Sequence, residues 1–291
     1  MLPILITILL LVLPIVAIGS IAPFCVAGLG AFLAETMYCS LPLRVFHGGK
    51  TPPLLLFSSS KADRRDGIVV IFCGAGGPDL NTDRLAAAVR SNDRRMRIRR
   101  LVHVCDWKPY GSSLIRAARN AAEIGEMLGK MVAEDSALHP SPTFYIHSIG
   151  ISVGAFGADS LIGAVSKRLP ARDGLSLRLS LLDPFTSKGV LRVLARLPQP
   201  LGRTATYCEQ FMNTDDHVPS TNAPLKHAVC YDVTSSGGKR DYSPLPSDSP
   251  GHAFPVYYYA RNLRRYIPDI GALAERHDGG AKRRGAVHVV E

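Results

Sequence analysis

The amino-terminal segment of the chain lacks charge. Residues 2–34 contain no Asp, Glu, Lys, Arg or His, and Glu35 is the first charged side chain after the amino terminus. A run of that length is not typical of a solvated helix and is long enough to cross a bilayer. Pro3, Pro14 and Pro23 also argue against a buried helix of a soluble domain, because proline interrupts the helical hydrogen-bond ladder.

Two interpretations of this segment stay open, a retained membrane anchor and a cleaved secretory signal. The length of the apolar run and the absence of Lys or Arg before it favour the anchor. A cleavage site would use the patch of small residues at 17–20. Both interpretations predict a membrane-anchored or secreted protein whose folded domain lies outside the cytoplasm.

Cysteine is scarce and lacks the spacing of a metal site. The chain has 6 cysteines, and no two of them form a C-x-x-C pair. This argues against a zinc knuckle, and we expect no metal site. In an exported protein Cys208 and Cys230 would be the best candidates for a disulfide, because they lie in segments that we expect to be neighbouring elements.

The positive charge of the chain is not accompanied by aromatic residues. The net charge is +10, and the basic clusters are residues 94–100 and 282–284. A nucleic-acid interface would need interleaved aromatic side chains or a known binding fold, so we expect no nucleic-acid partner. The clusters are typical of a solvated basic face, and attraction to anionic lipid headgroups is the better functional interpretation.

The glycine-rich loop 73–79 lacks the third glycine of a dinucleotide-binding motif. That position is occupied by Asp79, whose carboxylate would repel a pyrophosphate. We therefore expect no nucleotide cofactor, and nothing else in the sequence indicates a different one.

Apolar runs alternate with helical patterns along the rest of the chain. The strand-like runs are residues 53–57, 68–72, 97–104, 143–147, 177–182, 206–212 and 228–234. Apolar residues recur at helical spacing over 114–131, 153–169 and 256–266. Strands that alternate with helices predict an α/β fold with a mainly parallel central sheet flanked by helices.

A G-x-S-x-G motif lies between a predicted strand and a predicted helix. It comprises residues 150–154, with Ser152 at its centre. Strand, tight turn and helix are the context of the nucleophile elbow of α/β-hydrolases, in which the serine hydroxyl projects above the sheet. The sequence therefore predicts an α/β-hydrolase fold with Ser152 as the nucleophile.

A serine nucleophile needs a histidine base and an acid, in the chain order Ser, acid, His. His252 lies in a predicted loop that leads into the helix 256–266, which is the geometry that a base needs. Asp183 and Asp216 each follow a strand-like run, and position alone does not choose between them as the acid.

Several segments together resemble the lipase gene family, which comprises pancreatic, hepatic and lipoprotein lipases and their phospholipase A1 relatives. The matching segments, in family order, are 105–107, 147–155, 181–184, 213–215 and His252 with the tyrosines 257–259. The resemblance implies that Asp183 is the acid, because the family's acid lies in its L-D-P segment. It also implies an oxyanion hole made by the backbone N–H groups of Ala75 and Val153.

The chain departs from this family in the oxyanion loop, the elbow and the lid. Cys73 replaces the histidine before the first oxyanion donor, and Ile151 replaces a histidine of the elbow. Residues 232–251 are few and lack cysteine, whereas the family carries a disulfide-closed lid there. A short lid predicts an open site, which favours esterase or phospholipase A1 action over interface-activated lipolysis of triglycerides.

These features predict a membrane-associated serine ester hydrolase that acts on lipid-like esters as a lipase, phospholipase A1 or esterase. Two alternatives stay open: an inactive membrane-associated binding protein with this fold, and an acyltransferase that uses the same acyl-enzyme. The predicted organisation is a signal peptide or anchor (1–38), a linker (39–62), the catalytic domain (63–266) and a polar basic tail (267–291).

Overall fold

The computed structural model describes a defined part of the chain. The described residues are 25–38, 41–42, 66–111, 113, 116–138, 144–169, 174–188, 200–218, 221–244, 250–267 and 283–291. The predicted strand 53–57 and most of the predicted anchor or signal segment lie outside them. The chain divides into two units, Met1–Pro42 and Leu43–Glu291.

In the first unit, residues 25–38 form a helix. Its apolar side chains are exposed, among them Val26, Leu29 and Leu33. Within the described ranges, no helix combines the length and the apolar composition that a membrane span requires.

The second unit is built around a parallel sheet of seven strands. The order is β2-β1-β3-β4-β5-β6-β7, and every neighbouring pair is parallel. The strands are β1 (Gly67–Phe72), β2 (Arg100–Cys105), β3 (Phe144–Ile151), β4 (Leu175–Leu182), β5 (Tyr207–Met212), β6 (Val229–Asp232) and β7 (Val287–Val289). The predicted α/β fold, with a parallel central sheet flanked by helices, is confirmed.

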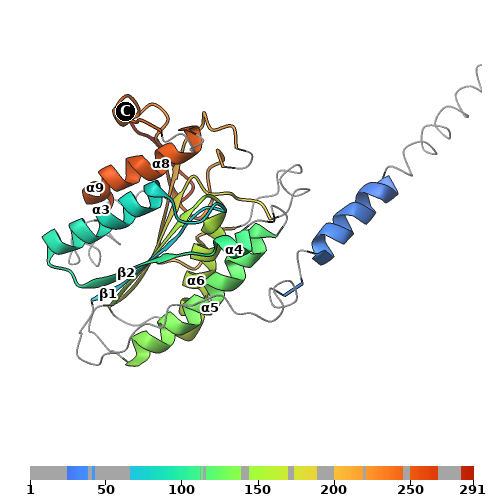
Figure 1. The fold of residues 1–291 in the computed structure, drawn as a ribbon, viewed down its shortest axis with the longest axis horizontal. Helices are drawn as coiled ribbons and strands as arrows, with labels where there is room; N and C mark the ends of the chain where they lie inside the picture. Colours follow the sequence, from blue (N-terminus) through green and yellow to red (C-terminus); the bar gives the residue numbers. More distant parts are fainter. Residues whose placement is uncertain are drawn as a thin grey trace, which may run out of the picture. The chain divides into compact units, whose positions relative to one another are not determined.

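Helices cover both faces of this sheet (Figure 1). One face carries α3 (Leu80–Met96), α8 (Pro250–Arg261) and α9 (Leu263–Tyr266), and the other carries α4 (Lys108–Gly111), α5 (Ala117–Leu138) and α6 (Ala155–Arg168). Each face has its own hydrophobic core. A strand covered on both sides needs a continuous apolar run, which explains why residues 68–72 are all 0% exposed.

The helix α3 determines where β2 begins. Arg97 follows the helix with a φ of 54°, and its N–H bonds to the carbonyls of Arg94 and Asp93. A left-handed residue of this kind ends a helix. The chain therefore enters the sheet at Arg100, three residues later than the sequence predicts.

The carboxyl-terminal residues also enter the sheet. We expected a polar tail over 267–291, but within it β7 pairs with β6, with Tyr231 opposite His288. Val290 is buried, and its N–H bonds to the carbonyl of Asp232 at 2.9 Å. The apolar residues of this short segment thus form an edge strand.

The suggested disulfide between Cys208 and Cys230 is not formed, and both thiols are free and buried. The expectation that they lie on neighbouring strands is correct, but Gln210 is the residue opposite Cys230. An offset of two residues along one strand, added to the spacing between strands, separates the Cα atoms by about 8 Å, which is too far for a disulfide. Cys230 Sγ instead lies 3.2 Å from Gln210 Oε1.

Candidate active site

Ser152 lies in a strained turn at the carboxyl end of β3. Its φ is 54°, a left-handed conformation that side chains other than glycine rarely adopt. The turn is the 3-10 segment Ser152–Gly154, which leads directly into α6. Strain of this kind persists where the surrounding structure enforces it, and it is frequent at functional sites.

The two glycines of the motif are required by close backbone contacts. A Cβ added to Gly150 would lie 2.6 Å from the Cα of Ala155. One added to Gly154 would lie 2.4 Å from the carbonyl oxygen of Cys73 and 2.6 Å from that of Phe72. Gly154 thus packs α6 directly onto the end of β1, and any larger residue would displace the elbow.

The loop after β1, predicted to form part of the oxyanion hole, lies beside the serine. A Cβ added to Gly74 would lie 3.6 Å from Ser152 Cβ, and Ala75 is the next residue. Trp107 holds the start of this loop in place, because its Nε1 donates to the carbonyl oxygen of Cys73 at 2.9 Å. Burial raises the pKa of Cys73 to about 12, so its thiol stays neutral. Val153, the other predicted donor, is buried within the elbow.

His252 lies in the first turns of α8, whereas the sequence predicts a loop. Pro250 is the first residue of that helix, a position that suits proline because its missing N–H has no helical partner there. Pro255 lies inside the helix and leaves the carbonyl of Gly251 without its usual donor. Asn213 Nδ2 donates to that carbonyl at 2.8 Å. This bond from a neighbouring loop compensates the internal proline and holds the turn that carries His252.

Both candidate acids contact the same nitrogen of His252. Nδ1 lies 2.6 Å from Asp183 Oδ2 and 3.1 Å from Asp216 Oδ2. Asp183 is 0% exposed and also accepts the N–H of Asn213 at 3.2 Å. Asp216 Oδ2 is held by the hydroxyl of Thr221 at 2.7 Å. The structure thus brings His252 together with both of its candidate acids, and Asp183 lies closer to Nδ1 than Asp216 does.

The three groups shift one another's pKa values. Burial would lower the pKa of His252, but the neighbouring carboxylates of Asp183 and Asp216 outweigh it and raise that pKa above 6.5. Burial raises the pKa of Asp183 to about 7, against the opposing bond to His252. The pKa of Asp216 is lowered, because bonds to Asp183 and Thr221 outweigh its desolvation. The imidazolium form of His252 is therefore stabilised.

Ser152 and His252 lie at the same edge of the sheet, Ser152 after β3 and His252 in the first turns of α8. The N–H of Phe185, just after Asp183, bonds to the Ser152 carbonyl at 3.0 Å and links the ends of β3 and β4. Among the described residues, no hydrogen bond joins Ser152 Oγ to the His252 ring. Catalytic bonds of this type are often long before substrate binds.

The group Asp183, Asp216 and His252 has ligand atoms within 4.8 Å of one another, a spacing that would also suit a metal ion. The sequence predicts no metal here. The 2.6 Å contact at Nδ1 is a short charge-assisted hydrogen bond, which already uses the nitrogen that would face the ion. This contact is the arrangement that orients a histidine base.

The segment 232–251, which the sequence predicts to be a short lid, contacts the rest of the domain in its described part. Tyr242 packs against Phe254 and Tyr257 of α8, with ring centroids 5.5 and 5.0 Å apart. Lys239 pairs with Asp215 at 2.9 Å. The described part of this segment, 233–244, is therefore held against α8 and against the loop after β5.

A second histidine, His147, lies inside a polar network that the sequence did not reveal. Its Nε2 lies 2.8 Å from Ser180 Oγ, and Ser180 Oγ donates to Glu209 Oε1 at 2.6 Å. Arg178 pairs with Glu209 at 2.8 Å and also donates to the carbonyl of Tyr266. Every member is buried. The network lies between the middle of the sheet and the helices α8 and α9.

No protein family and no curated protein matches this chain. Among solved structures, it is similar to Thermogutta terrifontis esterase 2 phosphoramylated by tabun, with 14% identity and a TM-score of 0.35, over 72% of this chain and 86% of that one. It is also similar to an uncharacterized protein from Pseudomonas aeruginosa, with 14% identity and a TM-score of 0.35. That match covers 76% of this chain and 42% of the other. Likenesses this distant carry no argument about activity.

Proposed function

We propose that this protein is a serine ester hydrolase with Ser152 as nucleophile, His252 as base and Asp183 as acid. One observation carries the proposal: a serine held at a φ of 54° lies at the same sheet edge as a histidine whose Nδ1 is 2.6 Å from a buried carboxylate. This combination is unfavourable for stability, because it includes a strained backbone and buried ionisable groups. A catalytic role explains both features at once.

In the proposed reaction, Ser152 Oγ attacks the ester carbonyl while His252 Nε2 takes its proton. Asp183 stabilises the resulting imidazolium through Nδ1. The backbone N–H groups of Ala75 and Val153 would bind the oxyanion, each contributing about 3 kcal/mol. His252 then returns the proton to the leaving alcohol. A water molecule then attacks the acyl-enzyme carbonyl while His252 takes its proton. His252 returns that proton to Ser152 Oγ as the carboxylic acid leaves.

The substrate class that we propose is a lipid-like ester, with esterase or phospholipase A1 action favoured over triglyceride lipolysis. The attachment of residues 233–244 to α8 and to Asp215 supports this choice, because a lid that opens at an oil interface would have to break those contacts. Activity on a soluble short-chain ester should therefore be present without an interface. A sharp rise of activity when a triglyceride emulsion forms would contradict this part of the proposal.

Covalent labelling by a fluorophosphonate tests the nucleophile. We expect labelling of the wild type and none of Ser152→Ala, because an activated serine oxygen displaces fluoride from the probe and forms a phosphonate ester. His252→Ala should label far more slowly. Ser148→Ala is the matched control, since Ser148 lies on the same strand and its buried Oγ has no hydrogen-bond partner within the described part of the chain. Labelling that persists in Ser152→Ala would refute the proposal.

The missing bond between Ser152 and His252 favours one competing function, that of an inactive binding protein with this fold. The same experiment separates the two. Wild-type protein that is folded but neither labels nor hydrolyses a short-chain ester would be a binding protein. Labelling that depends on both Ser152 and His252 would establish that the bond forms when a substrate is present.

A further inference from the structure

A basic groove lies between α3 and the junction of α8 and α9, at the sheet edge opposite Ser152. Helix α3 begins at the carboxyl edge after β1, so Asn92 and Arg95 in its last turns lie at the amino edge. The pairing of Asp93 with Arg100, the first residue of β2, fixes this end of the helix. The groove has a volume of about 210 Å³. Because the groove lies at the amino edge of the sheet, it is separate from the proposed catalytic residues at the carboxyl edge.

A buried amide donor faces this groove. Asn92 is 7% exposed, and its Oδ1 accepts a hydrogen bond from Arg95 Nη2 at 2.7 Å. That bond fixes the orientation of the amide, so the group left over is the NH₂. Within the described residues, Asn92 Nδ2 has no hydrogen-bond partner. Buried donors are nearly always paired with an acceptor. A ligand bound in the groove could supply the acceptor that Asn92 Nδ2 lacks.

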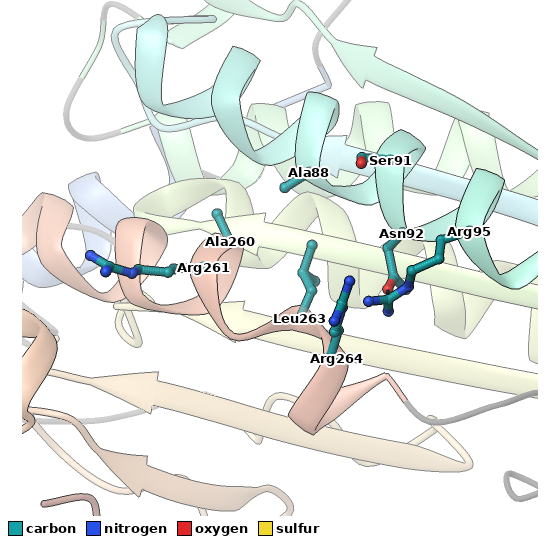
Figure 2. Close-up of a pocket in the computed structure, with 8 residues that line it drawn as sticks. All are labelled: Ala88, Ser91, Asn92, Arg95, Ala260, Arg261, Leu263 and Arg264. Carbon is teal, nitrogen blue, oxygen red and sulfur yellow. Dashed lines mark hydrogen bonds between the residues drawn. The ribbon is translucent and has the colours of Figure 1, made fainter.

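Two guanidinium groups accompany the amide. In Figure 2 the polar ends of Asn92, Arg95 and Arg264 turn toward the same part of the groove. Neither arginine forms an ion pair with a described residue. Arg261, at the other end of the groove, is compensated by Asp241 at 3.3 Å. The groove has no acidic lining residue, so the charge at this end is uncompensated.

Helix dipoles explain only part of this arrangement. Basic residues in the last turn of a helix interact favourably with its carboxyl end, which accounts for Arg94 and Arg95 in α3. The dipole effect does not require a buried amide donor, nor side chains from two separate helices that converge. These two features together indicate a ligand with several acceptor oxygens and negative charge.

We propose that this groove binds a phosphate group. Arg95 and Arg264 would each offer a planar pair of donors, a geometry that matches phosphate oxygens. Asn92 Nδ2 would donate to a third oxygen. The small side chains of Ala88 and Ala260 leave the space between α3 and α8 open to the rest of the ligand. The phosphate belongs either to a soluble phosphorylated molecule or to a lipid headgroup.

Two measurements on the full chain distinguish these sources. The first is calorimetric titration with inorganic phosphate against chloride at equal ionic strength. The second is flotation with phosphatidylcholine vesicles that contain or lack phosphatidic acid. Saturable binding of inorganic phosphate supports a soluble ligand, and binding only to vesicles with phosphatidic acid supports a headgroup. Absence of binding in both measurements would overturn the proposal.

Matched variants test the groove itself. Arg95→Gln/Arg264→Gln should weaken binding roughly tenfold or more, because two charge-assisted contacts are lost. Arg94→Gln/Arg265→Gln removes the same charge from the same two helices outside the groove, so binding should change by less than about twofold. Equal weakening by both pairs would show attraction by net charge alone and would overturn the site.

A single isosteric change provides a second test. Asn92→Asp keeps the size of the side chain and the acceptor for Arg95, but it replaces the unpaired donor with a carboxylate oxygen. It should weaken phosphate binding at least as much as the loss of one arginine, while hydrolysis of a short-chain ester stays unchanged. Unchanged phosphate binding in Asn92→Asp would contradict the proposed role of the amide.

Discussion

His252 of α8 and His147 of β3 show how the same side chain is given opposite properties. His252 lies between two carboxylates, which raise its pKa above 6.5. His147 is desolvated and lies near Arg178 and Arg100, and its pKa is well below 6.5. One site stabilises the imidazolium and the other excludes it. The charge of the neighbours, and not burial alone, decides which histidine can take a proton.

The tautomer of each histidine follows from the same contacts. Nδ1–H of His252 faces the carboxylates, which leaves Nε2 as the acceptor that a base needs. At His147, Ser180 uses its hydroxyl proton for Glu209, so Nε2 must donate to Ser180 Oγ. Nδ1 of His147 then remains without a partner among the described residues. His252 is arranged for proton transfer, whereas His147 serves as a fixed donor in the core.

The largest expected effect is that of removing the closer carboxylate from His252. Asp183→Asn should lower kcat for a short-chain ester about 10⁴-fold, because the amide favours the wrong tautomer and cannot stabilise the imidazolium. Steady-state kinetics measures this effect, and circular dichroism verifies the fold. If Asp183→Asn retains most activity while Asp216→Asn loses about 10⁴-fold, the roles of the two acids are reversed.

The next largest effect is expected at the network of His147. Arg178→Met should lower the free energy of unfolding by about 3–5 kcal/mol, because it leaves the carboxylate of Glu209 buried without its ion-pair partner. Urea denaturation followed by circular dichroism measures this loss. The double variant Arg178→Met/Glu209→Gln should recover part of it, since the unpaired charge is then absent.

The control for this prediction is an ion pair of the same chemistry at the surface. Arg119 pairs with Glu123 at 2.6 Å on α5, but the arginine side chain is 42% exposed. Arg119→Met should cost only about 0.3–0.5 kcal/mol. A loss in Arg178→Met no larger than in Arg119→Met would mean that the buried pair does not stabilise the sheet.

A smaller effect is expected from the second carboxylate of His252. Asp216→Asn should lower kcat by about tenfold or less. It should also move the acidic limb of the kcat/KM profile to lower pH, because the Asp216 carboxylate raises the pKa of His252 and its removal lowers that pKa. The profile between about pH 5 and 9 measures this shift. Asp215→Asn is the matched control: its carboxylate is 67% exposed and pairs with Lys239, so the limb should not move.

The sequence predicted those parts of the molecule that depend on neighbouring residues. The apolar run 68–72 and the strand, turn and helix around Ser152 are local patterns, and both appear as predicted. The spacing of the glycines follows from contacts with Ala155 and with the end of β1, which any elbow of this type must make.

Long-range contacts account for what the sequence did not predict. The sequence predicts His252 in a loop that leads into the helix 256–266. In the structure the helix already includes His252, and Asn213 satisfies the carbonyl that Pro255 leaves free. The sharing of one imidazole by two carboxylates depends on where the loops after β4 and β5 meet α8. The edge strand β7 has only three residues, and its partner β6 lies far earlier in the chain. None of these contacts has a local signal.

The smallest effect concerns titration of the two histidines, which nuclear magnetic resonance follows through the imidazole Cε1–H signals. His252 should titrate with a midpoint above 6.5, and the midpoint of His147 should lie well below 6.5. Because the folded pKa of His252 is raised, the stability that it contributes is complete below its unfolded pKa and is lost as the pH rises through the folded value. The variants His252→Asn and Ser180→Ala assign the two signals. A midpoint of His147 near 6.5 would contradict the opposition between the two sites, because it would mean that the arginines and the desolvation around His147 do not act on the ring.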